Sequence, residues 1–147
     1  KDIESTRRAC EQFKTQPVLV LNFLEGTRFT PEKHARTQSP YRYLLKPKSG
    51  GLAFAMTSFG ERINTLLDIT IVYPDGSKGL WDFLAGRVPR VIVEVKSITL
   101  PHAFYQGDYE NDPKYRAEFH SWVAQLWQRK DQRIGELLQE AGGASSS

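Results

Sequence analysis

A short run of polar and charged side chains, Glu25-Gly26-Thr27-Arg28, is the part of this sequence best suited to chemistry. It follows the apolar stretch 17–21, Pro-Val-Leu-Val-Leu, which is typical of a buried strand. In open α/β sheets, ligands bind at the carboxyl ends of strands. An arginine at such an end suits a phosphate or carboxylate, because its planar guanidinium donates two parallel hydrogen bonds to either group. The run therefore predicts an anion-binding turn.

Each residue of the run has an expected role in that turn. Gly26 lets the backbone approach a ligand closely or adopt a positive φ. Thr27 and Arg28 are expected to donate hydrogen bonds to phosphate oxygens, and Glu25 to orient Arg28 or a basic neighbour. The alternative interpretation is a tight turn that carries a surface pair between Glu25 and Arg28.

A second basic segment, 46–51, has the sequence Lys-Pro-Lys-Ser-Gly-Gly. It precedes a helix expected over Leu52–Ile63, for which Ser49 is a candidate N-cap. The amino end of a helix offers unpaired N–H groups and a positive dipole to an anion. The segment lacks the glycine and lysine spacing of a P-loop. The alternative is a cationic loop followed by two glycines that serve packing.

The elements that position these residues indicate an α/β fold, with a mixed or partly parallel sheet flanked by helices. A long polar connection is expected over Leu24–Tyr43, and only one face of the last strand is fully apolar. Packing of the last helix on the sheet is favoured over its lying on a bilayer. The expected strands are Val18–Phe23, Leu66–Tyr73 and Val88–Leu100, and the expected helices are 2–14, Leu52–Ile63, Leu80–Leu84 and Pro113–Glu140.

Three blocks in order carry a resemblance to a known family. The segment Phe23–Lys33 resembles the Glu-Gly-Thr-Arg block of the glycerolipid acyltransferases, and Leu45–Gly51 and Leu67–Pro74 follow it as later family blocks do. The similarity runs from Asp2 to about Leu138, and it is closest to the subgroup of lysocardiolipin acyltransferase-like and bacterial YihG-like proteins. It implies that residues 1–140 are the carboxyl-terminal part of an acyltransferase domain, with a flexible tail over 141–147.

The resemblance implies an activity and a substrate site. The whole protein would transfer an acyl group from acyl-CoA or acyl-carrier protein to the hydroxyl of a lysophospholipid such as 1-acylglycerol-3-phosphate. No cofactor and no metal is implied. Glu25, Gly26, Thr27 and Arg28 would hold the acceptor, and Lys48 would contact its headgroup. One departure is Leu24, where many members of the family have proline.

The general base of that family is missing from this sequence. The family uses a His-x-x-x-x-Asp motif, in which the aspartate orients the imidazole that activates the acceptor hydroxyl. The three histidines His34, His102 and His120 are followed five places on by Ser39, Gly107 and Gln125. Since the family's motif lies upstream of the Glu-Gly-Thr-Arg block, we expect a fragment with no catalytic residue of its own, inactive in isolation.

The distribution of charge along the sequence indicates which kinds of partner the chain is suited to bind. The net charge of +3 is uneven: residues 1–50 carry ten Lys or Arg against five acids, and the remainder carries ten against twelve. The basic half suits a phosphorylated headgroup or an anionic membrane surface, although a solvated basic face is the alternative. The charges are too balanced to favour nucleic acid. A non-catalytic α/β module that binds anionic lipid or a protein partner is the second functional hypothesis.

Cysteine content and hydropathy indicate the compartment. Cys10 is the single cysteine, so an internal disulfide and a Cys-based metal site are both excluded, which fits a reducing compartment. No stretch approaches the roughly 18–20 apolar residues of a membrane-spanning helix. Together with the resemblance, this predicts membrane association at the cytoplasmic face, at the inner membrane of a bacterium, through the rest of the protein.

Overall fold

The computed structural model describes residues 19–63, 65–76, 80–105 and 107–143. The expected helix over residues 2–14, including Cys10, lies outside them. The elements in chain order are α2 (Pro31–Thr37), α3 (Gly50–Phe59), the 3₁₀ turn η2 (Gly60–Arg62), β1 (Thr65–Val72), α4 (Leu80–Leu84), β2 (Ile92–Thr99), the 3₁₀ turn η3 (His102–Phe104) and α5 (Pro113–Gly143).

The sheet of the described residues is a single antiparallel pair. β1 and β2 pair in register from Thr65 opposite Thr99 to Val72 opposite Ile92, and α4 lies in the connection between them. The expected combination of a sheet with flanking helices is confirmed at this coarse level. The described part of the chain contains no parallel strand pair.

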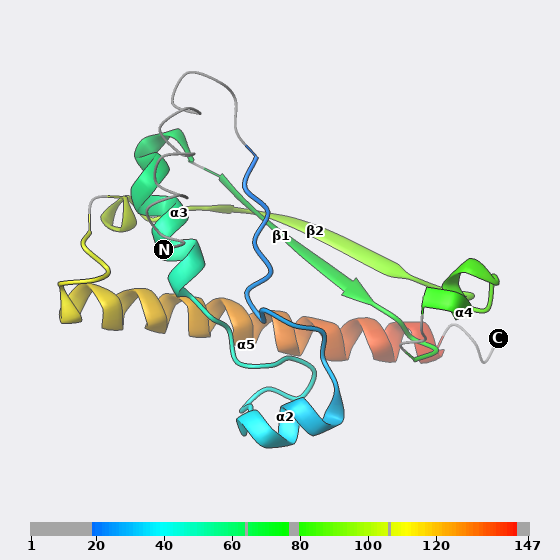
Figure 1. Ribbon diagram of the computed structural model, residues 1–147. Helices are drawn as coiled ribbons and strands as arrows, with labels where there is room; N and C mark the ends of the chain where they lie inside the picture. The colour runs from blue at the N-terminus through cyan, green and yellow to red at the C-terminus, as the bar shows by residue number, and fades with distance from the viewer. Residues whose placement is uncertain (1–18, 64, 77–79, 106, 144–147) are drawn as a thin grey trace.

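Helix α5 is the longest element and lies along the ribbon of β1 and β2 (Figure 1). Apolar residues recur along it at spacings of three and four, so one stripe is buried and the rest faces solvent. The helix predicted from Pro113 is confirmed and continues to Gly143. Its buried residues are Tyr115, Phe119, Val123, Leu126, Trp127, Ile134, Leu137 and Ala141.

Two apolar clusters along α5 form the core. The first surrounds the fully buried Phe119, where α3, η3 and α5 meet. The second surrounds Trp127 and joins α5 to Leu44 and to Val72 of β1. Leu24 packs against both clusters, so the segment that precedes the Gly26 turn is fixed between them.

The segment over residues 24–43 differs from the polar loop that was predicted there. The polar connection predicted over Leu24–Tyr43 contains helix α2, which begins at the N-cap Thr30, whose hydroxyl accepts from the Lys33 amide. Pro31 at the first turn favours this start. Sequence periodicity gave no sign of α2, because none of its seven residues is buried.

The buried strand predicted over Val18–Phe23 is wrong for the part that the structure describes. Residues 19–23 form no strand pair, and Leu19, Leu21 and Phe23 are exposed. An apolar run becomes a buried strand only where a neighbouring strand pairs with it and another layer covers it. Neither is present for residues 19–23 within the described part of the chain.

Two of the predicted strands form, β1 close to its predicted bounds and β2 within Val88–Leu100, but the faces of the strands are arranged differently from the prediction. The strand expected over Leu66–Tyr73 is β1, yet it is not buried on both faces, since Leu67, Ile69 and Ile71 alternate outward and are exposed. The helix predicted over Leu52–Ile63 is confirmed as α3, and it starts slightly earlier, directly after Ser49.

Candidate functional site

The turn at Gly26 brings two of the predicted blocks together. The Gly26 amide donates to the Phe23 carbonyl over 2.8 Å, and Gly26 has a φ of +66°. The Lys48 amide donates to the Leu24 carbonyl over 2.6 Å. The Lys48 side chain lies against the turn: a Cβ atom added to Gly26 would be 3.3 Å from the Lys48 Nζ. Lys48 and the glycine, predicted separately as anion ligands, are therefore neighbours.

A further lysine, which sequence reasoning missed, completes this basic cluster. The Lys33 ammonium donates to the Thr27 Oγ1 over 2.7 Å and to the Arg28 carbonyl over 3.2 Å. The sequence signal that could have found it is Thr30-Pro31, an N-cap residue followed by proline, which starts a helix close behind the run and places Lys33 in its first turn. The Arg28 side chain is exposed and makes no hydrogen bond or ion pair with any described residue. We call Gly26, Thr27, Arg28, Lys33 and Lys48 the cationic turn.

Glu25 faces the interior. Its carboxylate accepts from the Leu45 amide over 3.1 Å, and it forms no ion pair with Arg28 among the described residues. Burial raises the pKa of Glu25, while the Leu45 amide and the positive charge of Lys130 act in the opposite direction. Glu25 therefore fixes the turn to Leu45, and Lys130 is the basic group whose positive charge favours the ionised form of Glu25.

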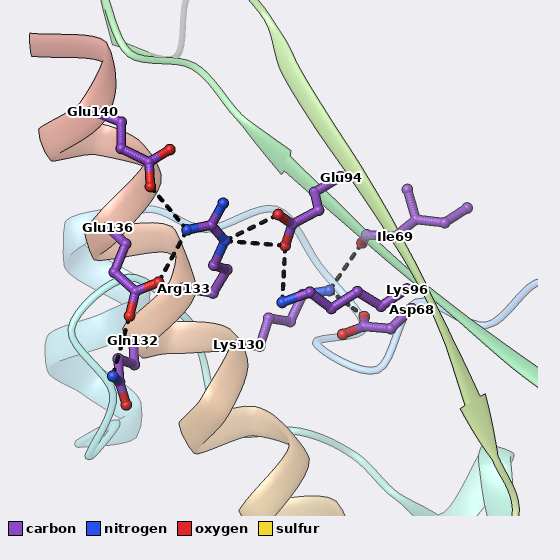
Figure 2. Close-up of polar contacts among 9 residues, drawn as sticks. All are labelled: Asp68, Ile69, Glu94, Lys96, Lys130, Gln132, Arg133, Glu136 and Glu140. Carbon is purple, nitrogen blue, oxygen red and sulfur yellow. Dashed lines mark hydrogen bonds and ion pairs between the residues drawn. The ribbon is translucent and has the colours of Figure 1, made fainter.

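Helix α5 stabilises the position of Leu45, the residue to which Glu25 bonds. The Trp127 Nε1–H donates to the Leu45 carbonyl over 3.0 Å, so the Leu45 residue is bound through both its amide and its carbonyl. The Lys130 ammonium forms an ion pair with Asp68 and donates to the Ile69 carbonyl over 2.9 Å (Figure 2). The cationic turn is thus connected through Glu25 and Leu45 to α5, and through Lys130 to β1.

The amino end of α3 lies beside the cationic turn, since Ser49 directly follows Lys48. Ser49 occupies the N-cap position, but its hydroxyl makes no capping bond. It lies 3.3 Å from the Tyr109 hydroxyl, which in turn lies 2.5 Å from the His120 Nε2. The buried Ser49 therefore connects α3 to α5.

The histidines have structural partners. The His34 Nε2 lies 2.6 Å from the Tyr41 carbonyl and closes the loop after α2. His102 stacks edge-on against Tyr105, and His120 bonds to Tyr109. Within the described ranges no histidine pairs with a carboxylate, and no three potential ligands among His, Cys, Asp and Glu gather as a metal site would need. Nor is any described helix long and apolar enough to cross a membrane.

Comparisons with known proteins give no relative: no family model, no curated protein and no solved structure matches this chain.

Gly26 provides a test of how the turn holds Lys48. Gly26→Ala adds a Cβ in a left-handed conformation and 3.2 Å from the Lys48 Cδ. We expect it to lower the free energy of unfolding by about 1–2 kcal/mol. Gly142→Ala, where a Cβ meets nothing within 4 Å, is the matched control and should cost nothing measurable. Urea unfolding of both variants checks this, and equal stabilities would contradict the strained turn.

Glu25 predicts a pH dependence of stability. A carboxyl whose pKa is raised by folding binds its proton more readily in the folded state, so its contribution to stability declines as pH rises above the ordinary value of 4.5. Glu25→Gln keeps an acceptor for the Leu45 amide and removes this decline. We therefore expect the stability of Glu25→Gln relative to the wild type to increase between about pH 4 and about pH 7.

Glu32 is the control, because its expected effect on stability changes with pH in the opposite direction. Its own amide and the Thr30 hydroxyl lower the pKa of Glu32, so its contribution is present above pH 4.5 and is lost as pH falls. Glu32→Gln should therefore differ from the wild type most at neutral pH, as the less stable protein. Urea unfolding at several pH values measures both variants. The same trend for the two substitutions would refute the burial of the Glu25 charge.

Proposed function

We propose that this chain supplies the acceptor-binding half of a glycerolipid acyltransferase, with the cationic turn as the site for the phosphate of 1-acylglycerol-3-phosphate or a related lysophospholipid. The acyl donor of the whole protein is an acyl thioester, acyl-CoA or acyl-carrier protein. The whole enzyme works at the cytoplasmic face of a membrane. The proposal rests on the order of the three sequence blocks and on the geometry of the turn.

The observation that carries the proposal is the position of the Lys48 ammonium against Gly26. Arg28 follows Gly26 by two residues, and its exposed side chain pairs with no described residue. A cation beside a backbone without a Cβ allows an anion to approach the chain closely, and a second cation two residues on can add hydrogen bonds to it. Lys33 adds a third positive charge and fixes Thr27. Because the Thr27 hydroxyl accepts from Lys33, its own proton remains available to donate to a phosphate oxygen.

The mechanism assigned to these residues is positioning. A bound phosphate fixes the glycerol backbone of the acceptor, so that its free hydroxyl can be presented to a base and an acyl thioester. No described histidine pairs with a carboxylate, and the sequence contains no His-x-x-x-x-Asp. In this proposal the proton is removed by a group outside the chain.

Glycerol 3-phosphate, which is soluble and forms no micelles, is the probe for this site. We expect calorimetry at low salt to detect binding of glycerol 3-phosphate and none of glycerol, with affinity falling as salt increases. Acyl transfer from a thioester to 1-acylglycerol-3-phosphate by the purified chain should not exceed a heat-killed control. Binding of glycerol as strongly as its phosphate would exclude a phosphate site, and turnover would show that the chain has a base.

The second hypothesis, a non-catalytic module for anionic lipid, gives a different result. Such a module would sediment with vesicles that contain anionic lipid, and it would do so equally well without Arg28. The acceptor-site proposal requires that Arg28→Ala weaken binding of the soluble phosphate. Vesicle binding that is independent of Arg28, with no binding of glycerol 3-phosphate, would favour the module.

A further inference from the structure

The residues directly before the cationic turn expose large apolar side chains to solvent. Leu21 is 72% exposed and Phe23 is 82% exposed, and Leu19 is exposed as well. The backbone at the end of this segment is fixed, because the Gly26 amide donates to the Phe23 carbonyl. Phe23 is therefore held in solvent by a hydrogen-bonded turn. We call Leu19, Leu21 and Phe23 the apolar run.

The residues that alternate with the apolar run face the protein. The Asn22 side chain lies against α3, since a Cβ added to Gly51 would be 3.2 Å from the Asn22 Nδ2. Leu24 packs against both apolar clusters. The segment thus turns Leu21 and Phe23 outward. Neighbouring exposed apolar side chains of this size mark a place where another apolar surface docks.

The charge around the apolar run indicates what that surface is. Residues 19–50 contain six Lys or Arg against two acids, and one of the acids, Glu25, faces the interior. The side chains of Arg28 and Lys48 are exposed and pair with no acid among the described residues. The segment therefore presents apolar and positively charged groups together, which suits a surface that is apolar and negatively charged.

The exposed apolar side chains of α4 lack this accompanying charge. Trp81 and Leu84 are 77% and 65% exposed, which is close to the exposure of the apolar run. The cation that follows them, Arg87, forms an ion pair with Asp82 over 2.8 Å. Charge complementarity with an anionic surface therefore favours the apolar run over α4.

An anionic bilayer has the matching dimensions. The headgroup layer on each side of a bilayer is about 5–8 Å thick, and the acyl chains begin beneath it. Phe23 and Gly26 are the first and fourth residues of a hydrogen-bonded turn, so their Cα atoms lie within about 7 Å of each other. Phe23 can therefore reach the acyl chains while Gly26 stays among the phosphates, and aromatic and leucine side chains favour that boundary.

We propose that the apolar run inserts into an anionic bilayer while the cationic turn remains at the lipid phosphates. The consequence for the acceptor rests on the proposed function: the lysophospholipid reaches the turn from the bilayer, with its phosphate at Gly26 and its acyl chain beside Phe23. The chain itself then contacts the membrane, in addition to any contact that the rest of the protein makes.

Co-sedimentation with vesicles of phosphatidylcholine and phosphatidylglycerol in equal parts tests this contact. We expect the chain to bind these vesicles, and to bind phosphatidylcholine alone at least about tenfold more weakly. Leu21→Ser combined with Phe23→Ser should weaken vesicle binding roughly thirtyfold and leave the calorimetric affinity for glycerol 3-phosphate unchanged. Trp81→Ser combined with Leu84→Ser, an exposed apolar pair on α4, is the matched control and should leave vesicle binding unchanged.

Phe23→Trp guards against a loss that reflects misfolding, because an aromatic ring at this position should bind the vesicles at least as well as the wild type. Failure of the wild type to bind vesicles would overturn the proposal. So would vesicle binding that survives the loss of Leu21 and Phe23, or that falls equally in the α4 control. Glycerol 3-phosphate separates the two proposals: vesicle binding through Phe23 without binding of the soluble phosphate would refute the acceptor site alone.

Discussion

Trp127→Ala is expected to lower the free energy of unfolding by about 3–5 kcal/mol, which is the cost of removing a large aromatic side chain from a core. The ring is buried at the centre of the second apolar cluster, and its Nε1–H donates to the Leu45 carbonyl. The substitution leaves a cavity and an unpaired carbonyl. Because Leu45 also binds Glu25, we expect the cationic turn to loosen at the same time.

Two further tryptophan substitutions separate these effects. Trp127→Phe keeps most of the volume and removes only the hydrogen bond, so it should cost about 1–2 kcal/mol. Trp81→Ala, at a side chain that is 77% exposed on α4, should change stability by less than about 0.5 kcal/mol. Urea unfolding followed by circular dichroism measures all three. A similar loss for Trp81→Ala and Trp127→Ala would contradict the assignment of Trp127 to the core.

The combined substitution Arg28→Ala with Lys48→Ala is expected to weaken glycerol 3-phosphate binding roughly thirtyfold, or about 2 kcal/mol. Each cation contributes about 1 kcal/mol, a modest value because both side chains are exposed and screened by water and salt. Neither side chain makes a hydrogen bond or ion pair with a described residue, so the fold should be unaffected. Calorimetry measures the affinity and urea unfolding measures the stability.

Lys114→Ala is the matched control for that loss of charge. Lys114 is exposed in the first turn of α5, and among the described residues only Asp112 bonds to it, through the Lys114 amide. It should leave the affinity unchanged. An equal decrease for Lys114→Ala would show that the overall charge, and not the cationic turn, attracts the phosphate.

The sequence predicted best the elements with a strong and continuous pattern. Apolar residues at spacings of three and four run along α5 for its whole length, and the predicted start at Pro113 is confirmed. The single helical turn Leu80–Leu84 is also confirmed with its predicted bounds. Helix α2 was missed, because it depends on a local cap at Thr30 and carries no buried stripe.

The orientation of the ribbon could not be predicted from its own residues. Alternation in β2 showed one apolar face, but alternation does not say which face meets a helix. That choice involves contacts between distant residues, such as the ion pair of Lys130 with Asp68, which lie 62 positions apart, and the packing of Val72 in the cluster around Trp127. The uncovered apolar run at residues 19–23 was predicted as a strand for a similar reason, since pattern alone does not supply a partner strand.

The residue types of the candidate site could be predicted from the sequence, but the positions of these residues relative to one another could not. The residue types at Gly26, Thr27 and Arg28 indicated an anion-binding turn from their sequence alone. The approach of Lys48 depends on the backbone bond between its amide and the Leu24 carbonyl, which no spacing predicts. The inward position of Glu25 depends on Leu45, which Trp127 holds from 82 positions away.

The most direct test of the account is a titration of the ¹⁵N-labelled chain with glycerol 3-phosphate, followed through its amide signals. We predict saturable shifts that are concentrated at Gly26, Thr27, Arg28 and Lys48, and that disappear when Arg28 and Lys48 are both replaced by alanine. Shifts centred on the basic residues of α5, Arg129 among them, or no saturable shift at all, would contradict the assignment of the cationic turn as a phosphate site.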